Sequence, residues 1–432
     1  MILLLVSLDL TEDMAVETGL KNYPILAADS LDMEALRMQV KEIGSSLWPK
    51  LEFQFGYSYN SYVTQMEMVS PVRWHFIEVP PGSGQGIAYP DSFVVDTFEF
   101  GRSHNYRFSV TLSRVLWSWG RMERGYFLQK DLLRSRWKDY EARKQAYAYT
   151  VRQVYVMTLL AKEAHGVAEE SYKFAEENLK LVEEAYRNGR VTRLDYLRAK
   201  VNYENSRYNL SNARKSYEKA ISRLMLILGL PDSVEINLKD TLALPDGSPD
   251  TTLQRADIEY IKEQARILKE IGKEEIKAFL PTLFGSVSYN YQRPLGFEDK
   301  WGSNWVATLG VNWTLFDGLK PYNSYRRYRY QADALRRRAV FLEQKARTDL
   351  RNALREYEGA LERLKAAGEA LKMASESFQL SREAYRNGRI SYTDLKQVEV
   401  SYRNTLLNYK RAVADVRLSY WKAYYVARVP VE

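Results

Sequence analysis

The heptapeptide EAYRNGR occurs twice in this chain of 432 residues, at Glu184–Arg190 and again at Glu383–Arg389. About 10⁵ pairs of positions stand against about 20⁷ possible heptapeptides, so coincidence has odds on the order of 10⁻⁴. The two copies therefore indicate an internal duplication in which equivalent residues lie 199 positions apart. Each half of the chain is expected to build the same set of elements.

Each copy has the sequence of a turn between two helices. An Asn-Gly pair follows the last apolar residue, and Gly is the preferred left-handed residue that closes a helix. Thr192-x-x-Asp195 and Ser391-x-x-Asp394 then have the pattern of capping boxes, which open a new helix. The repeated heptapeptide is thus predicted to be the tip of a helical hairpin, used once in each half.

Long helices are predicted on both sides of each tip. No proline lies between Pro90 and Pro231 or between Pro321 and Pro430, and proline is the residue that interrupts helices. Inside these stretches, apolar and small residues recur at alternating spacings of three and four, as in a coiled-coil seam. A helix over residues 120–186 would be roughly 100 Å long, which is too long for the interior of one globule.

Four other segments show the alternation of β-strands. In Leu51–Asn60 every odd position is apolar or aromatic and every even one is polar or Gly, which predicts a strand with one apolar face. Each of the four runs has about 9 to 13 residues, the length of a tilted strand that crosses a bilayer. Aromatic residues cluster near the ends of the runs, as in an interfacial girdle; they are Tyr57, Tyr59, Tyr289, Tyr291, Trp301, Trp305 and Trp313.

The predicted elements form two repeats. Residues 1–8, which begin MILLLV, are interpreted as the remnant of a signal peptide. Residues 66–103 contain PPGSGQG and are expected to form a long loop. The first repeat covers residues 9–230, with a short helix, strands at about 50–62 and 104–116, and a helical hairpin at about 118–229. A linker at 231–252 leads to the second repeat at 253–429, with a helix at about 253–279, strands at about 282–293 and 303–316, and a hairpin at about 318–428.

The composition argues against several classes of protein. The net charge of +8 comes from 63 basic and 55 acidic residues, which are mixed along the chain and form no nucleic-acid-binding tract. With no cysteine there is no disulfide framework and no thiolate metal site. No apolar window of 18 residues occurs, so a membrane-spanning helix is excluded. The chain is either soluble or crosses a membrane as strands.

Four strands cannot close a barrel by themselves. The smallest known spanning barrels have eight strands, and lipid does not tolerate an open sheet edge. Two copies would supply eight strands and three would supply twelve. A soluble sheet packed on a core is the alternative, but no segment remains to form the opposing apolar layer. In the membrane case the expected lipid-facing residues are Phe53, Phe55, Tyr57, Trp305 and Trp313.

The order of these motifs, and their double occurrence, resembles the outer membrane efflux proteins of the TolC type. The motifs are Leu280-Pro-Thr-Leu283 at a strand start, LFDG at Leu315–Gly318 before a long helix, and the Y-x-x-G tip. The resemblance runs from about Asp9 to Arg428. In the first half Trp117-Ser-Trp-Gly120 replaces LFDG.

The resemblance implies a mainly α fold in which long antiparallel coiled-coil hairpins build a tunnel. It also implies that four strands per chain contribute to a trimeric, twelve-stranded transmembrane β-barrel. The protein would lie in the outer membrane with a long periplasmic extension. It would serve as the passive exit duct of a tripartite efflux or type I secretion system. Drugs, metal ions and secreted polypeptides stay open as cargo, and a soluble coiled-coil scaffold or adaptor with a small sheet is the alternative function.

The same resemblance assigns partners and sites. The partners are two further copies of the chain, a periplasmic adaptor protein, an inner-membrane transporter and outer-membrane lipid. A pore constriction is expected at Asp394, which matches the first of two acidic positions in the family. Gln397 occupies the second of these positions. Asp195 is the counterpart of Asp394 in the first tip. Both aspartates also fit a plain role as helix caps. The docking tips comprise Arg187, Asn188, Gly189, Arg190, Arg193, Arg386, Asn387, Gly388 and Arg389.

Other chemistry is not indicated. The three histidines, His75, His104 and His165, are separated in the sequence and have no Glu or Cys at ligand spacing. No Walker motif, nucleophile elbow or H-E-x-x-H sequence occurs. We therefore expect no enzyme activity, no cofactor, no metal site and no nucleic-acid partner.

Overall fold

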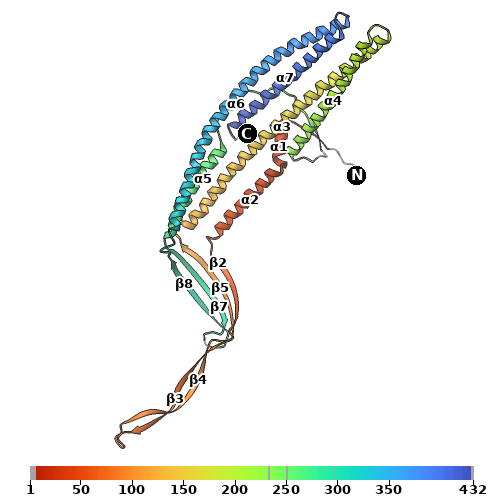
Figure 1. The fold of residues 1–432 in the computed structure, drawn as a ribbon. Helices are drawn as coiled ribbons and strands as arrows, with labels where there is room; N and C mark the ends of the chain where they lie inside the picture. Colours follow the sequence, from red (N-terminus) through yellow and green to blue (C-terminus); the bar gives the residue numbers. More distant parts are fainter. Residues whose placement is uncertain (1–5, 232–233, 250–251, 297, 430–432) are drawn as a thin grey trace. The chain divides into compact units, whose positions relative to one another are not determined.

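The computed structural model describes residues 6–231, 234–249, 252–296 and 298–429 (Figure 1). The chain divides into two compact units. We call Met1–Met38, Lys130–Lys269 and Arg329–Glu432 the helical unit, and Gln39–Gln129 with Glu270–Tyr328 the strand unit.

Two long helical hairpins dominate the fold, as predicted. Helices α3 (Arg121–Arg187) and α4 (Arg193–Leu228) form the first, and α6 (Lys320–Arg386) and α7 (Tyr392–Val426) form the second. Helices α3 and α6 have 67 residues each, and both their first and their last residues lie 199 positions apart. Over these two helices the duplication therefore holds residue by residue. Over the described residues, none of the helices is long and apolar enough to cross a membrane.

Alanines at a strict seven-residue spacing form the buried face of α6. Ala332, Ala339, Ala346, Ala353 and Ala360 are each at most 2% exposed. A seven-residue repeat keeps the same helix face turned to its neighbours, as in a coiled coil. The small side chain lets those neighbours approach closely, so this seam buries backbone and Cβ atoms where a Leu seam would bury long side chains.

Larger side chains fill the core nearer the middle of the helical unit. Val151, Tyr155 and Leu159 of α3 pack with Leu224 and Leu228 of α4, and all five are nearly inaccessible to solvent. Val413 and Ala414 of α7 join the same cluster. This core therefore joins the two halves of the chain.

The N-terminal segment and the linker between repeats contain structure that the sequence did not indicate. Strand β1 (Val6–Leu10) pairs in parallel with β6 (Val234–Leu238), so part of the predicted linker at 231–252 belongs to a small sheet. The predicted leader at 1–8 lies mostly outside the described residues, and Val6–Leu8 belong to β1. Two helices, α1 (Glu12–Asn22) and α2 (Pro24–Ser45), stand where one short helix was expected, and α5 (Ala256–Ile276) begins the second half.

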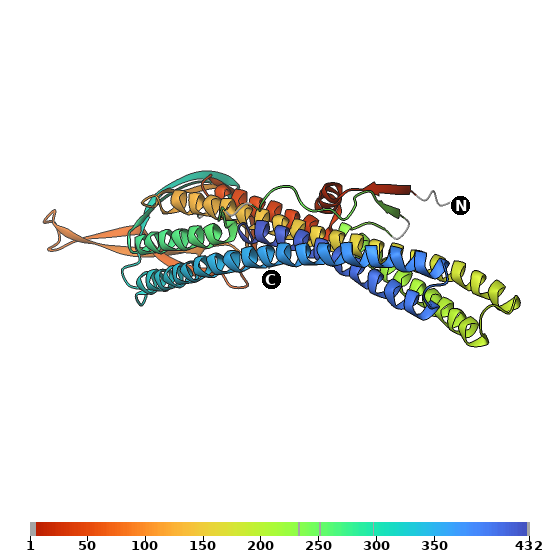
Figure 2. The same cartoon turned by 90° about the horizontal axis from the view of Figure 1, so that it is seen from above.

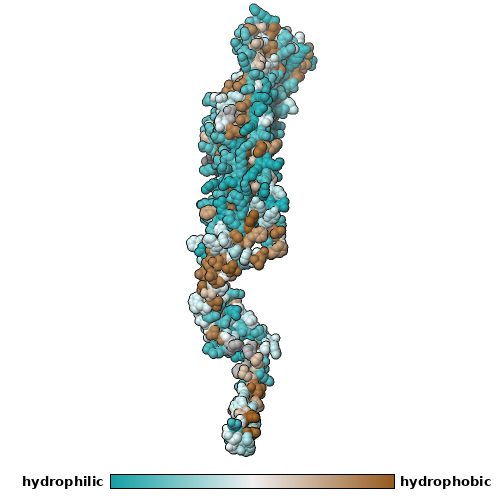
Figure 3. Space-filling model, turned by 90° about the vertical axis from the view of Figure 1, so that its left-hand side faces the viewer, coloured by the Kyte–Doolittle hydropathy of each residue, from teal (hydrophilic) through white to brown (hydrophobic). Residues whose placement is uncertain are grey.

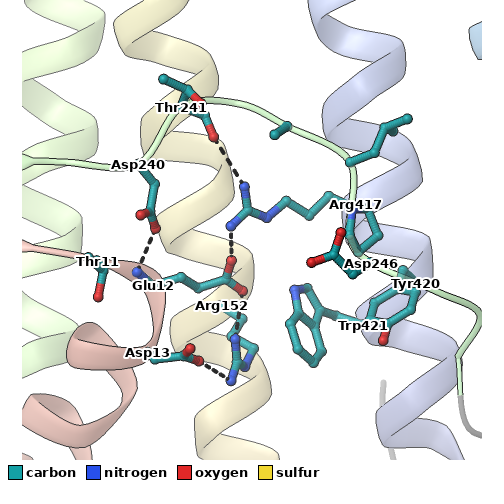
Figure 4. A pocket seen from close by; sticks show the side chains of 13 residues that line it. Thr11, Glu12, Asp13, Arg152, Asp240, Thr241, Asp246, Arg417, Tyr420 and Trp421 are labelled. Carbon is teal, nitrogen blue, oxygen red and sulfur yellow. Dashed lines mark hydrogen bonds and ion pairs between the residues drawn. The ribbon is translucent and has the colours of Figure 1, made fainter.

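A buried carboxylate fastens this N-terminal segment to both halves of the chain (Figure 4). Glu12 is 5% exposed. Its Oε1 lies 2.9 Å from Nη1 of Arg152 on α3, and its Oε2 is paired with Arg417 on α7. The Arg152 guanidinium also stacks 3.9 Å from the ring centroid of Trp421. Removing a carboxylate from water costs free energy unless the charge is paired. Here two guanidinium groups pair with it.

The strand unit contains the predicted four-stranded antiparallel sheet. Its order is β2 (Lys50–Tyr59), β5 (His104–Trp117), β7 (Thr282–Arg293) and β8 (Gly302–Asn312). Consecutive neighbours pair in continuous register, apart from one irregularity in β5. Within the described residues, β2 and β8 are the outer strands, so each leaves one edge without a partner strand.

The predicted loop at 66–103 is wrong, because most of it is a second hairpin. Strands β3 (Thr64–Glu78) and β4 (Gly86–Phe100) pair with each other, and only the PPGSGQG region forms the turn between them. The sequence hid these strands because both faces of the hairpin carry apolar residues, so no alternation marks them. Pro71 and Pro90 lie inside the strands and further obscured the pattern.

The same left-handed turn leads from strand to helix in both halves. Trp119 and Gly120 have φ values of 58° and 72°, and Gly318 and Leu319 have 71° and 64°. These pairs occupy equivalent positions, with the glycine first in one half and second in the other. The first half, which lacks LFDG, therefore forms the same turn as the second. In each half one of the two left-handed residues is not glycine, which is uncommon for positive φ.

Candidate functional site: the hairpin tips and the apolar sheet face

Both tips of the helical unit close in the same way. In the first tip the N–H of Arg190 donates to the carbonyl of Ala185 at 2.7 Å, and the N–H of Gly189 donates to Tyr186 at 2.9 Å. This pair of bonds is a Schellman motif, which needs a left-handed residue at its centre; Gly189 supplies it with φ 69°. Gly388 has the same φ in the second tip. The repeated heptapeptide thus specifies one turn used twice.

The two tip aspartates form the predicted capping boxes. Asp195 Oδ2 accepts from Thr192 Oγ1, and Asp394 Oδ2 accepts from Ser391 Oγ, both at 2.7 Å. The hydroxyls in turn accept from the backbone N–H groups of the aspartates at 3.2 Å. Asp394 and Gln397 are exposed and Asp195 is half-buried. The cap role is therefore shown for both aspartates, while the constriction role stays a prediction.

The predicted docking residues are all exposed at the end of the helical unit where both tips lie (Figures 1 and 2). Arg187 pairs with Glu183 at 2.7 Å along its own helix. An exposed pair of this kind contributes little stability, so its guanidinium can exchange partners at low cost. The remaining tip arginines, Arg190, Arg193, Arg386 and Arg389, are exposed at this end, and the carboxylates of Glu184, Glu383 and Asp394 are exposed beside them.

A hydrogen bond that the sequence did not reveal joins the two hairpins beside the second tip. The amide nitrogen of Asn202 on α4 donates to the hydroxyl oxygen of Tyr392 on α7 at 2.9 Å. Burial raises the pKa of Tyr392 to about 12, and the hydrogen bond from Asn202 acts in the opposite direction. The phenol is therefore neutral at ordinary pH and holds the second hairpin to the first.

A second connection lies two turns along α7. Glu399 is fully buried and pairs with Lys396 at 2.8 Å and, at 2.6 Å, with Arg403. Arg403 also donates to the carbonyl of Val167 on α3 at 2.9 Å. Glu399 thus positions the guanidinium that bonds to the other hairpin. The spacing of Lys396, Glu399 and Arg403 along one helix face was the available sequence indication, and it looks like an ordinary surface ion pair.

In the strand unit, the register gathers most of the apolar residues of the sheet on one face. Paired residues of an antiparallel ladder share a face, and Phe53 pairs with Val110 and Phe55 with Phe108. On the opposite face Thr111 and Ser288 share a hydrogen bond of 2.9 Å between their hydroxyls. The predicted lipid-facing residues are exposed, from 50% for Tyr57 to 72% for Trp305. One chain thus presents a continuous apolar face that it does not cover.

Tryptophans mark the end of the sheet that leads into the helices. Trp119 Nε1 donates to the carbonyl of Pro281 at 2.8 Å, and Trp313 Nε1 donates to that of Phe279 at 3.0 Å. Trp313 lies just beyond the end of β8 and is 58% exposed. Apolar side chains gather at this end and along β3 and β4, whereas the surface over the helices is mainly hydrophilic (Figure 3). Tryptophan with a satisfied N–H and an exposed ring suits a membrane interface.

Comparison with known proteins agrees with this geometry. The sequence matches the family described as outer membrane efflux protein over residues 15–230 and 269–420. A comparison with curated protein sequences gave no match. The chain therefore belongs to the outer membrane efflux protein family: it is an outer-membrane efflux channel and not an enzyme. This assignment excludes the soluble scaffold considered above.

Solved structures share the fold at low sequence identity. The CmeC outer membrane channel of Campylobacter jejuni has a TM-score of 0.72 at 18% identity, covering 96% of this chain and 85% of that one. The outer membrane protein VceC of Vibrio cholerae has a TM-score of 0.72 at 13% identity, covering 96% and 95%. The MtrE channel of Neisseria gonorrhoeae, solved in its open state, has 0.69 at 18%, covering 96% and 88%. This likeness confirms the predicted TolC-like architecture.

Proposed function

We propose that three copies of this chain form the exit duct of a tripartite efflux or type I secretion system. The observation that carries the proposal is the four-stranded sheet with one exposed apolar face and two outer strands, β2 and β8. Lipid covers the apolar face, and the neighbouring copies cover the edges. The duct is passive, and an inner-membrane transporter supplies the energy through a periplasmic adaptor.

Closure follows from pairing β8 of one copy with β2 of the next. Such a head-to-tail contact repeats around a rotation axis and closes when the rotation divides a full turn. Three copies supply twelve strands from four each, within the range known for bilayer-spanning barrels. The polar face that includes Thr111 and Ser288 then lines the lumen, as in other water-filled barrels.

The hairpin tips act as the periplasmic mouth. The exposed arginines of both tips dock the adaptor, and a ring of three Asp394 carboxylates, one from each copy, narrows the pore. Gln397 cannot add a second ring of charge. The bonds of Tyr392 to Asn202 and of Arg403 to Val167 hold the second hairpin against the first and keep this mouth closed. Adaptor docking opens it by replacing these contacts.

Fractionation and labelling of intact cells test the proposal. The protein should be recovered from the outer membrane as an oligomer that resists SDS. The chain has no native cysteine, so a single introduced cysteine reports its own position. A membrane-impermeant thiol reagent should label Ser83→Cys in the turn between β3 and β4, and should leave Asn188→Cys and Asn387→Cys unlabelled. If only the tips were labelled, the protein would lie in the membrane in the opposite orientation. Recovery as a monomer in the soluble fraction would refute the proposal that the chain forms a duct.

A further inference from the structure

The hairpin of β3 and β4 exposes large apolar side chains on both of its faces. Adjacent residues of a strand point to opposite faces, and Phe76 and Ile77 are 57% and 47% exposed. Trp74, on the same face as Phe76, is 59% exposed, and Ile87, which pairs with Ile77, is 67% exposed. A two-stranded hairpin alone is marginally stable in water. Contiguous apolar surface of this kind marks an interaction site.

This hairpin continues the two strands that enter the sheet. The ladder of β2 and β5 ends with the pair Tyr59 and His104, and the next ladder starts with the pair Thr64 and Phe100. Between them the N–H of Asn60 donates to the carbonyl of Ser103 at 2.8 Å. Three hairpins would therefore rise from the mouth of one barrel, close enough for the tether to give each a high local concentration around the others.

The charges divide the hairpin into an acidic base and a balanced middle. Near the sheet it carries Glu67, Asp96 and Glu99, and Glu99 is paired with Arg102 at 2.8 Å. Between residues 69–77 and 87–95, the sequence holds only one arginine, Arg73, and one acidic residue, Asp91. The carboxylates of Glu67 and Asp96 repel their counterparts in the other copies at the base, whereas the balanced charges of the middle do not oppose contact. A balanced apolar surface also lacks the basic residues that an anionic lipid surface would attract.

We propose that the β3–β4 hairpins of the three subunits pack against one another through this apolar middle segment, residues 69–77 and 87–95. The inference rests on the proposed trimer, and names the occupant of the exposed surface as the same hairpin of the other two copies. Three two-stranded hairpins then share one apolar core outside the barrel, and the acidic bases leave an opening around it. The assembly narrows the outer mouth of the duct.

Site-specific cross-linking of the full-length protein in the outer membrane tests this packing. Phe76→Cys places a unique thiol in the middle segment, and Glu67→Cys places a matched thiol at the base of the same strand. Mild oxidation should convert most of the Phe76→Cys subunits to disulfide-linked dimers, with a several-fold lower yield for Glu67→Cys. A variant in which a short Gly-Ser turn joins Gln65 to Glu99, which pair across the ladder, should still form an SDS-resistant trimer.

The outcomes separate this inference from the duct itself. Loss of the trimer in the wild-type protein would refute the proposed function. If the trimer forms but Phe76→Cys gives no more dimer than Glu67→Cys, the packing is wrong. A polarity-sensitive fluorophore attached to the thiol of the Phe76→Cys variant then identifies the alternative: quenching by nitroxide-labelled lipid would show that the hairpin lies on the membrane, and quenching by iodide would show that it is free in water. Either result overturns the inference.

Discussion

The hydroxyl of Tyr392 lies 2.9 Å from the amide nitrogen of Asn202, and this contact joins the second helical hairpin to the first. Tyr392 is the first residue of α7, immediately after the second tip. When a hairpin rotates, its tip moves further than the rest of it. A bond next to the tip therefore restrains the part of the second hairpin that would move most. The contact therefore acts on the part of the duct that we assign to the closed mouth.

Tyr392→Phe should raise the open probability of the channel. The substitution removes the hydroxyl and keeps the ring, so the loss is one hydrogen bond, about 0.5 to 1.5 kcal/mol. Tyr203→Phe is the matched control, because the bond of Tyr203 to Tyr172, also 2.9 Å long, lies within the first hairpin. Single-channel recordings compare the two. Equal open probabilities would show that the Tyr392 bond plays no part in gating.

Burial of the Tyr392 phenol, and not the bond from Asn202, predicts loosening of the mouth at alkaline pH, because burial disfavours the charged phenolate. The pKa of Tyr392 is raised from 10.0 to about 12 in the folded chain, so the folded state holds this proton more tightly than the unfolded state. The stabilisation is complete below pH 10 and is lost as the pH rises towards 12. Wild-type channels should therefore open more often over this range, and Tyr392→Phe should reduce that dependence. An unchanged slope in the variant would assign the effect to other tyrosines.

Asp394→Asn should lower the cation preference of the channel. Three carboxylates around one axis concentrate negative charge in the narrow mouth, and this local field outweighs the net charge of +8. Asp195→Asn should mainly weaken a helix cap, by about 0.5 to 2 kcal/mol, with little effect on selectivity. Reversal potentials in a salt gradient measure both. Unchanged selectivity in Asp394→Asn would leave Asp394 as a cap and place the constriction elsewhere.

Phe55→Lys should impair assembly in the membrane. Phe55 lies on the exposed apolar face of β2, and a lysine facing lipid near the bilayer midplane costs roughly 2 to 4 kcal/mol. Gln54→Lys puts the same charge on the opposite face of the same strand, where water fills the lumen. The yield of SDS-resistant trimer reports the difference. Equal yields would show that the two faces are assigned wrongly.

Glu12→Gln should destabilise the folded chain far more than Asp13→Asn. Glu12 is buried between two guanidinium groups, and removal of one partner from a buried ion pair costs about 3 to 5 kcal/mol. The Asp13 side chain is 83% exposed although it lies 2.8 Å from the same Arg152, so its loss should cost at most about 1 kcal/mol. Urea unfolding followed by circular dichroism compares them. Similar shifts would mean that solvent screens Glu12 as well.

Regular patterns made most of the fold predictable from the sequence. The heptapeptide fixed both tips, because Asn-Gly followed by a capping box has few other uses, and the alternation in Leu51–Asn60 gave the first strand of the sheet. Strands β3 and β4 were missed because apolar residues lie on both of their faces, so their sequences do not alternate. Strand β6 lay in a segment dominated by turn residues.

The hidden parts of the candidate site depend on contacts between distant residues. Asn202 and Tyr392 lie in different halves of the chain, and nothing local marks either as a bonding partner. Glu399 looks like a surface charge in the sequence, and only the packing of α7 against the first hairpin buries it. Sequence patterns give the faces of single elements, whereas these bonds require the arrangement of the helices.

Conductance of the purified oligomer in planar lipid bilayers is the most direct test of a passive three-copy duct. Insertion of SDS-resistant trimers should give discrete current steps from channels that are mostly closed at neutral pH. Tyr392→Phe should lengthen the open periods, without any added nucleotide or transporter. Bilayers that stay silent, although protease protection shows that trimers have inserted, would contradict the proposal that this chain forms a duct through the outer membrane.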